Sequence, residues 1–132
     1  MARNSARPLS PHLQVWRWGA HMTVSIINRV MGAGLATVGT LALLWWIIAA
    51  ASGEKAYETF LSWASWPWAY VVWVGLSFAF FMHLCGGLRH FVMDIGAGFE
   101  LTANRIWAWL TMAAAVMLTA LFWIAILWKG AI

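Results

Sequence analysis

The chain divides into long apolar blocks separated by shorter polar segments. Three apolar blocks, at residues 31–51, 68–88 and 106–128, contain no Asp, Glu, Lys or Arg. Each is long enough to cross about 30 Å of hydrocarbon, because a helix rises about 1.5 Å per residue. A helix satisfies its own backbone hydrogen bonds and a lone strand does not. The pattern therefore predicts an all-α membrane protein with three transmembrane helices.

We expect these helices at residues 22–51, 66–92 and 104–129, within a larger helical bundle that includes a second anchor subunit. Residues 1–132 form one domain, in which a polar cytoplasmic N-terminal arm (1–21) precedes the three-helix region (22–132). The link at residues 52–68 predicts an outer loop with one interfacial turn. The link at residues 94–104 is short, and Thr102 or Asn104 is expected to cap the third helix, giving an antiparallel hairpin.

Composition supports a lipid environment and charge gives an orientation. The chain is 64% hydrophobic and 9% charged, which is too apolar for a soluble domain. Six basic residues flank one side of the predicted spans and two, Lys55 and Lys129, flank the other; the six are Arg3, Arg7, Arg17, Arg29, Arg89 and Arg105. This predicts a cytoplasmic N-terminus and an outer C-terminus. Anionic lipid accounts for the net charge of +4 without a nucleic acid partner. Seven tryptophans suit the interfacial belt: Trp16, Trp18, Trp63, Trp66, Trp68, Trp107 and Trp109.

The first apolar run begins late and is too long for a cleavable signal peptide. A motif that begins at Arg7 leaves no room for a mitochondrial transit peptide, so we expect a multi-pass protein of the bacterial cytoplasmic (inner) membrane, with a mature mitochondrial protein as the alternative. Cys85 is the single cysteine, which allows neither an internal disulfide nor a thiol-ligated cluster.

The second apolar block ends in HLCGGLRHFVMDIG (83–96). At 100° per residue, His83, Gly87, His90 and Asp94 fall within about 60° and form one stripe. His83 lies about 9 Å inward from the charged boundary, where a polar side chain requires an explanation. Its bare ring nitrogen suits a metal, and the glycines at 86 and 87 would leave room for a flat macrocycle. The pattern indicates haem.

The two histidines of this stripe cannot bind one iron from opposite sides, because they project from the same face of one helix. The other predicted spans offer no facing histidine, so a second axial ligand must come from another chain. Two alternatives stay open: His83 hydrogen-bonds to a neighbouring helix, and His90 is a headgroup-level residue.

A second polar cluster opens the first span, where His21, Ser25, Asn28 and Arg29 share a helix face. The first helix enters from the side at which the second exits, so this cluster and the His83 stripe meet in one leaflet. Together they can hydrogen-bond a quinone carbonyl or a haem propionate. The alternative is that Arg29 only anchors the helix to lipid. Glycines that follow in this span, at positions 32, 34 and 39, would let another helix approach closely.

Three segments of the chain match motifs of one family in the family's order. SIINRVMG resembles its SIxHRxTG motif, HLCGGLRHFVMDIG its HxxxGxRHxxxDxG motif, and RPLSPHLQVW (7–16) its RPLSPHLxIY motif. The sequence thus resembles the cytochrome b large membrane-anchor subunit of succinate dehydrogenase (succinate:quinone oxidoreductase, respiratory complex II).

The resemblance implies a complex in which a small membrane-anchor subunit and this chain sandwich one haem b. Both would hold an iron–sulfur subunit and a flavoprotein subunit at the cytoplasmic side. His83 would be one axial ligand of the iron, with the other from the small anchor subunit, and Ser25 and Arg29 would line the ubiquinone site. Electrons from succinate would reach ubiquinone here, so the chain would hold the acceptor and carry no catalytic residue.

Two positions depart from the family motifs. Asn28 replaces a histidine that contacts a haem propionate, and Met31 replaces a small hydroxyl residue. Propionate binding would then rely on Arg29 and His21, with one hydrogen bond from Asn28. Three alternative functions are a fumarate reductase-type anchor using menaquinol, a haem-free proton-coupled transporter with His83 as relay, and a structural anchor that binds neither cofactor.

Overall fold

A computed structural model of the chain describes residues 17–130, and every regular element in that range is helical. In chain order they are α1 (Ala20–Gly34), the π-helical segment η1 (Leu35–Gly39), α2 (Thr40–Ala51), α3 (Glu54–Ala64), α4 (Ala69–Asp94) and α5 (Leu101–Trp128). The motif predicted at residues 7–16, together with Arg3 and the belt residue Trp16, lies outside the described residues.

The three predicted spans are confirmed. Residues Ala20–Ala51 form one continuous helical rod, and this rod, α4 and α5 are each long and apolar enough to cross a membrane. The chain is therefore a multi-pass membrane protein. The second span begins at Ala69 rather than at 66, because residues 65–68 form turns around Pro67.

The third span begins at Leu101, three residues before its expected start, and the predicted cap at Thr102 or Asn104 is wrong. Glu100 occupies the N-cap position, and no side chain caps the helix. Asn104 instead lies inside the first turn of α5, where its side-chain oxygen accepts a hydrogen bond from Arg89 of α4.

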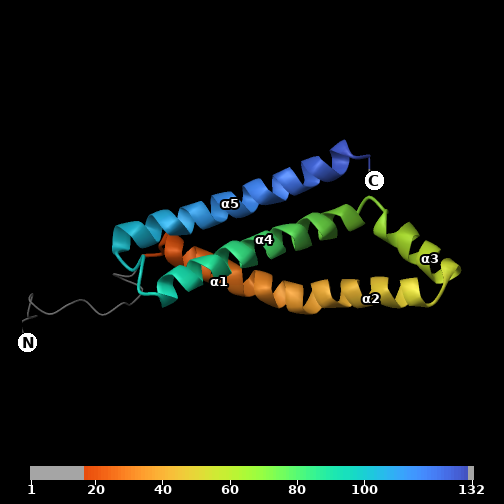
Figure 1. Cartoon of the computed structure of the whole chain (residues 1–132), viewed down its shortest axis with the longest axis horizontal. Coiled ribbons are helices and arrows are strands. Elements are labelled where there is room, and N and C mark those ends of the chain that lie inside the picture. Colours follow the sequence, from red (N-terminus) through yellow and green to blue (C-terminus); the bar gives the residue numbers. More distant parts are fainter. Residues whose placement is uncertain (1–16, 131–132) are drawn as a thin grey trace, which may run out of the picture.

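The predicted outer loop is also wrong, because most of it is the 11-residue helix α3. Apolar residues at positions 56, 57, 60, 61 and 64 recur with helical spacing and give this helix one apolar face. Phe60 is buried and packs edge-on against Trp45 of α2, with ring centroids 5.1 Å apart. Gly53, at φ 103°, allows the sharp turn between the two helices. α3 lies across the end of the bundle and connects α2 to α4 (Figure 1).

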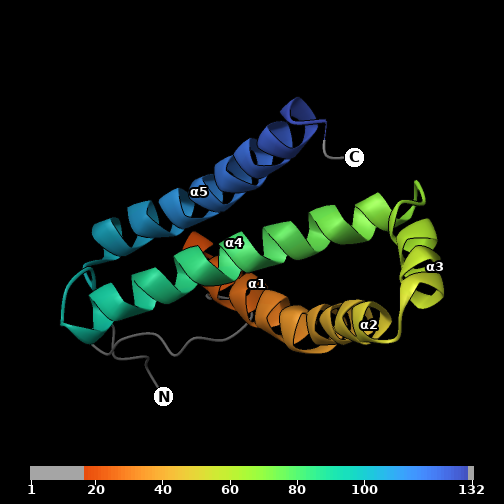
Figure 2. The same ribbon diagram turned by 45° about the vertical axis from the view of Figure 1, so that its right-hand side comes forward.

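α4 is the central helix of the molecule, packed against α1 and against α5 (Figures 1 and 2). The antiparallel hairpin of α4 and α5 is as predicted. The buried core joins Val24 of α1, Met82 of α4, and Ala108 and Ala115 of α5. Small residues on α5 let the other helices approach closely, since lipid supplies no strong hydrophobic force between helices.

Two buried threonines continue this small-residue face of α5. Thr111 and Thr119 each donate a hydrogen bond to a carbonyl of their own helix, at 2.8 and 2.7 Å, as the sequence predicts. Polar side chains whose hydrogen bonds are made within their own helix cost little free energy when they are buried between helices.

The first span changes its hydrogen-bond pattern in the middle, at η1. A π-helical turn accommodates one additional residue and redirects the helix axis locally. Beyond it, among the described elements, α2 packs against α3 and not directly against α4. The rod thus contacts α4 with its first half and diverges with its second.

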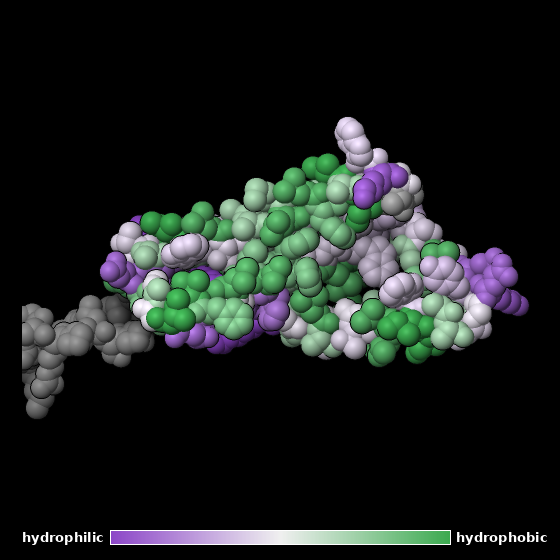
Figure 3. All heavy atoms as spheres, in the orientation of Figure 1, coloured by the Kyte–Doolittle hydropathy of each residue, from purple (hydrophilic) through white to green (hydrophobic). Residues whose placement is uncertain are grey.

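Apolar side chains cover the middle of the molecular face in Figure 3, and strongly hydrophilic residues gather mostly toward the two ends. The belt tryptophans that the structure describes are all exposed: Trp18, Trp107 and Trp109 where α1 and α5 begin, and Trp63, Trp66 and Trp68 around the end of α3. Their exposure at opposite ends of the spans agrees with two interfacial belts.

Candidate functional site

His83 lies on α4 where that helix crosses α1. Its ring covers Gly32, since a Cβ atom at that glycine would lie 2.9 Å from the imidazole Cε1 atom. The His83 Nδ1 atom is 3.4 Å from the backbone carbonyl oxygen of Asn28. A carbonyl only accepts, so in this contact Nδ1 carries the proton and Nε2 keeps its lone pair.

The expected alternative, a histidine that hydrogen-bonds to a neighbouring helix, is therefore realised at one ring nitrogen. The other ring nitrogen, Nε2, keeps its lone pair for a ligand, and His83 is exposed on the surface of this chain. Metal-binding histidines usually hold their other ring nitrogen in this way, because the bond fixes the tautomer and the ring orientation. The two interpretations are compatible.

Asn28 makes the reciprocal contact from α1 to α4. It is 9% exposed and lies against Gly86, where a Cβ atom added to the glycine would lie 2.7 Å from the Asn28 Cγ atom. The Oδ1 atom of Asn28 is buried without a hydrogen-bond partner. The prediction that Gly86 leaves room for a macrocycle is wrong, because the Asn28 side chain fills that space.

Gly87 differs from its neighbour. A Cβ atom there would meet nothing within 4 Å, so this glycine borders open space beside His83. Successive residues on a helix point about 100° apart. Gly86 therefore faces α1 and Gly87 does not.

The residues of the predicted His83 stripe share an open surface. His83, His90 and Asp94 are exposed and Gly87 is half-buried. α1 contacts this stripe at His83, and the rest of the stripe remains accessible, which agrees with a surface that another molecule contacts.

The predicted polar face of α1 is divided by the structure. His21 and Arg29 are exposed, Ser25 is half-buried and Asn28 is buried against α4. Asn28 thus lies at the edge that meets the neighbouring helix, and Arg29 lies at the opposite edge. The expected convergence of this face with the His83 stripe is confirmed, since α1 and α4 touch through Asn28 and His83.

Arg89 has a structural contact that the sequence did not reveal. Its guanidinium Nη2 atom donates a hydrogen bond to Asn104 Oδ1, which joins the end of α4 to the start of α5. Only the short, glycine-bearing link hinted that these residues would be near each other. Arg89 is therefore not a free cation beside the His83 stripe.

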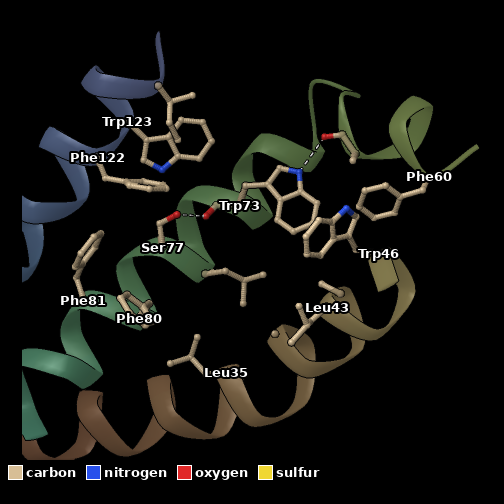
Figure 4. Close-up of a pocket in the computed structure, with 15 residues that line it drawn as sticks. Leu35, Leu43, Trp46, Phe60, Trp73, Ser77, Phe80, Phe81, Phe122 and Trp123 are labelled. Carbon is tan, nitrogen blue, oxygen red and sulfur yellow. Dashed lines mark hydrogen bonds between the residues drawn. The ribbon is translucent and has the colours of Figure 1, made fainter. Parts of the chain in front are cut away.

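A separate apolar groove of about 730 Å³ lies between the diverging α2 and the first half of α4 (Figure 4). Its walls include Leu35, Trp46, Trp73, Phe81 and Trp123. The indole of Trp73 donates to the Ala64 carbonyl at 2.9 Å, and the hydroxyl of Ser77 donates to the Trp73 carbonyl at 2.7 Å. The groove offers apolar contact and shares no residue with the His83 surface.

Three long apolar helices that present a histidine and an arginine toward one end define a polytopic membrane protein with polar residues gathered at that end. Residues 3–122 match the family model of the succinate dehydrogenase/fumarate reductase transmembrane subunit. The chain belongs to this family.

Individual relatives agree with the family match. The chain is 35% identical over 118 residues to the succinate dehydrogenase cytochrome b556 subunit of Rickettsia felis, covering 89% of this chain and 91% of that protein. It is 34% identical over 116 residues to the cytochrome b556 subunit of Paracoccus denitrificans, covering 87% and 88%. It is also 33% identical over 95 residues to the mitochondrial cytochrome b560 subunit of Sus scrofa, covering 71% and 56%.

Proposed function

We propose that this chain is the membrane-anchoring cytochrome b subunit of a succinate dehydrogenase, that it helps to bind one haem b, and that it forms part of the ubiquinone site. The observation that carries the proposal is the state of His83. Its Nδ1 atom is engaged by the Asn28 carbonyl, while its Nε2 atom belongs to a side chain exposed on an open helix face. The relatives named as cytochrome b subunits support a haem.

The residues present fit one side of a haem. His83 would hold the haem iron through Nε2, and the open space at Gly87 would leave room beside it. Within residues 17–130, no three His, Cys, Asp or Glu side chains gather where they would hold a metal ion together. The family resemblance implies that a second ligand would come from the small membrane-anchor subunit. When bound, a haem supplies one-electron transfer at a potential that its ligands and surroundings set.

Arg29 would supply a positive charge, and His21 a ring nitrogen that can hydrogen-bond, to haem propionates at this end of the bundle. Both are exposed on α1, the helix that touches His83. Asn28 is buried against Gly86 and its carbonyl contacts His83, so it would support the haem site through His83. This assignment follows the predicted departure from the family motif, in which an asparagine stands where a histidine is usual.

Ser25 and Arg29 would bind the quinone. The serine hydroxyl donates one hydrogen bond and the arginine is a fixed cation with several donors, so together they orient and polarise a carbonyl oxygen. Ser25 is half-buried one turn before Arg29, so both can face one ligand, and the charge of Arg29 supports a site near the boundary between hydrocarbon and headgroups. A lipid-soluble quinone can reach that depth without leaving the bilayer.

The predicted orientation supports a docking side for the other partners. Four of the six basic residues that predict the cytoplasmic side lie among the described residues, at 17, 29, 89 and 105, all at the end where α1 and α5 begin. The iron–sulfur and flavoprotein subunits would dock there, inside a bacterial cytoplasmic membrane. Succinate would be oxidised on the flavoprotein, so this chain positions the electron acceptor. A fumarate reductase anchor is the second candidate, because the family description covers both enzymes, although the relatives above are succinate dehydrogenase subunits.

The haem assignment is tested by His83→Ala in the purified four-subunit complex. We expect the reduced b-type absorption bands and the pyridine haemochrome to disappear, because the iron loses the only axial ligand that this chain supplies. His90→Ala, an exposed histidine two turns along the same stripe, is the matched control and should keep its haem. Full haem content in His83→Ala would refute the ligand role.

The quinone assignment is tested by Arg29→Ala. Loss of a charge-assisted hydrogen bond costs about 1.5–3 kcal/mol, so ubiquinone reduction should fall about 10- to 100-fold. Succinate–dye activity, which bypasses the membrane site, should be retained. An equal loss of both activities would contradict a role in quinone binding.

A further inference from the structure

We propose that Gly32 and Gly86 are positioning residues that together fix the orientation of the His83 imidazole and the strength of its Nδ1 hydrogen bond. The inference deepens the proposed haem site and rests on it only in the claim that the positioned ring binds iron. A Cβ atom at Gly32 would lie nearest Cε1 and Nδ1 of His83, and a Cβ atom at Gly86 would meet Asn28, so both glycines would act through His83 and not as ligands themselves.

Each of the two helices places one side chain over a glycine of the other. His83 of α4 places its ring over Gly32 of α1, and Asn28 of α1 places its side chain over Gly86 of α4. The residues on each helix are close in sequence, four apart on α1 and three apart on α4. Two side chains thus fill two glycine positions at a single helix crossing.

The backbone carbonyl of Asn28 links these two side-chain contacts. In a regular helix this oxygen accepts from the N–H four residues later, which here belongs to Gly32, and its second lone pair faces His83. The buried Asn28 side chain, held against Gly86, sets the distance between the two backbones. The His83 Nδ1 contact therefore depends on both glycines.

A methyl group at either position breaks the arrangement. At Gly32 it would lie 2.9 Å from Cε1 and 3.1 Å from Nδ1 of His83, which forces the ring away from the Asn28 carbonyl. At Gly86 it would collide with the Asn28 amide, which is short, buried and unable to move aside without separating the helices. Gly34 of α1 and Gly75 of α4 have nothing within 4 Å of such a methyl and provide one matched control on each helix.

The hydrogen bond at Nδ1 makes a histidine a more basic ligand. A more basic ligand stabilises ferric over ferrous iron and lowers the reduction potential. We expect Gly32→Ala and Gly86→Ala to raise the haem midpoint potential and to shift the low-spin ferric EPR signal. Gly34→Ala and Gly75→Ala should leave both unchanged.

The experiment uses the purified complex for redox titration and EPR, and the full-length chain without haem for ¹⁵N-histidine NMR. NMR should show the Nδ1–H tautomer of His83 in the unsubstituted chain and a mixture of tautomers in Gly32→Ala. Where Gly86→Ala reduces assembly, adding Asn28→Ala should restore it, since the second change removes the amide that the new methyl strikes.

An Nε2–H tautomer in the unsubstituted chain would overturn the inference, as would unchanged potentials and EPR signals in both glycine variants. Failure of Asn28→Ala to rescue Gly86→Ala would also contradict it. A complex without haem but with the Nδ1–H tautomer would refute the proposed function and leave the positioning role intact.

Discussion

Asn28 shows how one residue can serve three contacts at once. Its backbone carbonyl meets His83, its side chain fills the space above Gly86, and its Oδ1 atom is buried without a hydrogen-bond partner. A buried acceptor without a donor costs about 1–3 kcal/mol. The packing of the α1–α4 crossing must offset this cost in the folded chain.

Asn28→Asp tests this environment with almost no change in volume. A carboxylate is an acceptor only, and the Oδ1 position already lacks a donor, so we expect the assembled bundle to lose at least about 2 kcal/mol of stability. Thermal or SDS denaturation of the complex measures the loss. Ser25→Ala, on the same helix but only half-buried, should cost much less. A variant as stable as the parent would show that water or a lipid reaches this position.

At the scale of elements, the α4–α5 hairpin is joined at two levels. Small residues of α5 pack against Met82 in the middle of the bundle, and Arg89 bonds to Asn104 at its end. The sequence predicted the hairpin from a short link with glycines at 96 and 98, and both adopt positive φ. The hydrogen bond between Arg89 and Asn104 was not predicted, because Asn104 was interpreted as a helix cap.

Asn104→Ala removes the hydrogen bond to Arg89 without changing a residue of the proposed haem and quinone sites. A hydrogen bond to a charged donor contributes about 1.5–3 kcal/mol, and its loss leaves the half-buried Arg89 unpaired. We therefore expect lower thermal stability with haem content retained. Thr102→Ala, an exposed residue in the same turn, is the control. Equal effects from the two substitutions would argue that the turn itself, and not the hydrogen bond, determines stability.

The helix α3 was missed for a different reason. Serine, glycine, proline and charged residues at positions 52–55 and 65–67 are typical of a loop, and they enclose a segment with few charges. The apolar positions from 56 to 64 do have helical spacing, but the segment is only 11 residues long. Helices this short are marginal alone, so contact with Trp45 of α2 decides that it forms.

At the scale of the whole molecule, the chain leaves most of its apolar surface uncovered. Only 6% of the most apolar window of the first span is buried within the chain, and 17% of the windows in the other two. Lipid or another subunit must cover the remainder. The exposed His83 face belongs to this uncovered surface, which places the site at a boundary rather than in the core.

This boundary gives a prediction for the chain purified alone and supplied with haem. With one axial ligand from His83, we expect a five-coordinate, high-spin absorption spectrum that free imidazole converts to low spin. The intact complex should be low spin without added imidazole. The same measurement is made on an isolated chain that carries both His90→Ala and His21→Ala. If that chain still gave a low-spin spectrum, a further ligand would have to come from this chain, which would contradict a ligand from the partner.

The sequence by itself determined the three spans, their order and the end of the bundle at which the polar residues meet. Those features follow from the length and hydropathy of each block and from the cost of an unpaired backbone in lipid. Helical periodicity also grouped His83 with Gly87 and Ser25 with Arg29. Helical periodicity gives only the angle of a residue about its own helix axis, and it does not say which neighbouring helix that residue faces.

The tertiary structure decided which edge of each polar face is buried. Asn28 and Gly86 face each other because of how α1 crosses α4, and a crossing depends on contacts distant in sequence. The same crossing brought the Asn28 carbonyl to His83 and left Gly87 open. Helix periodicity repeats along one chain segment, whereas the distance between two helices depends on the small residues of both, which is why only the folded chain could show this contact.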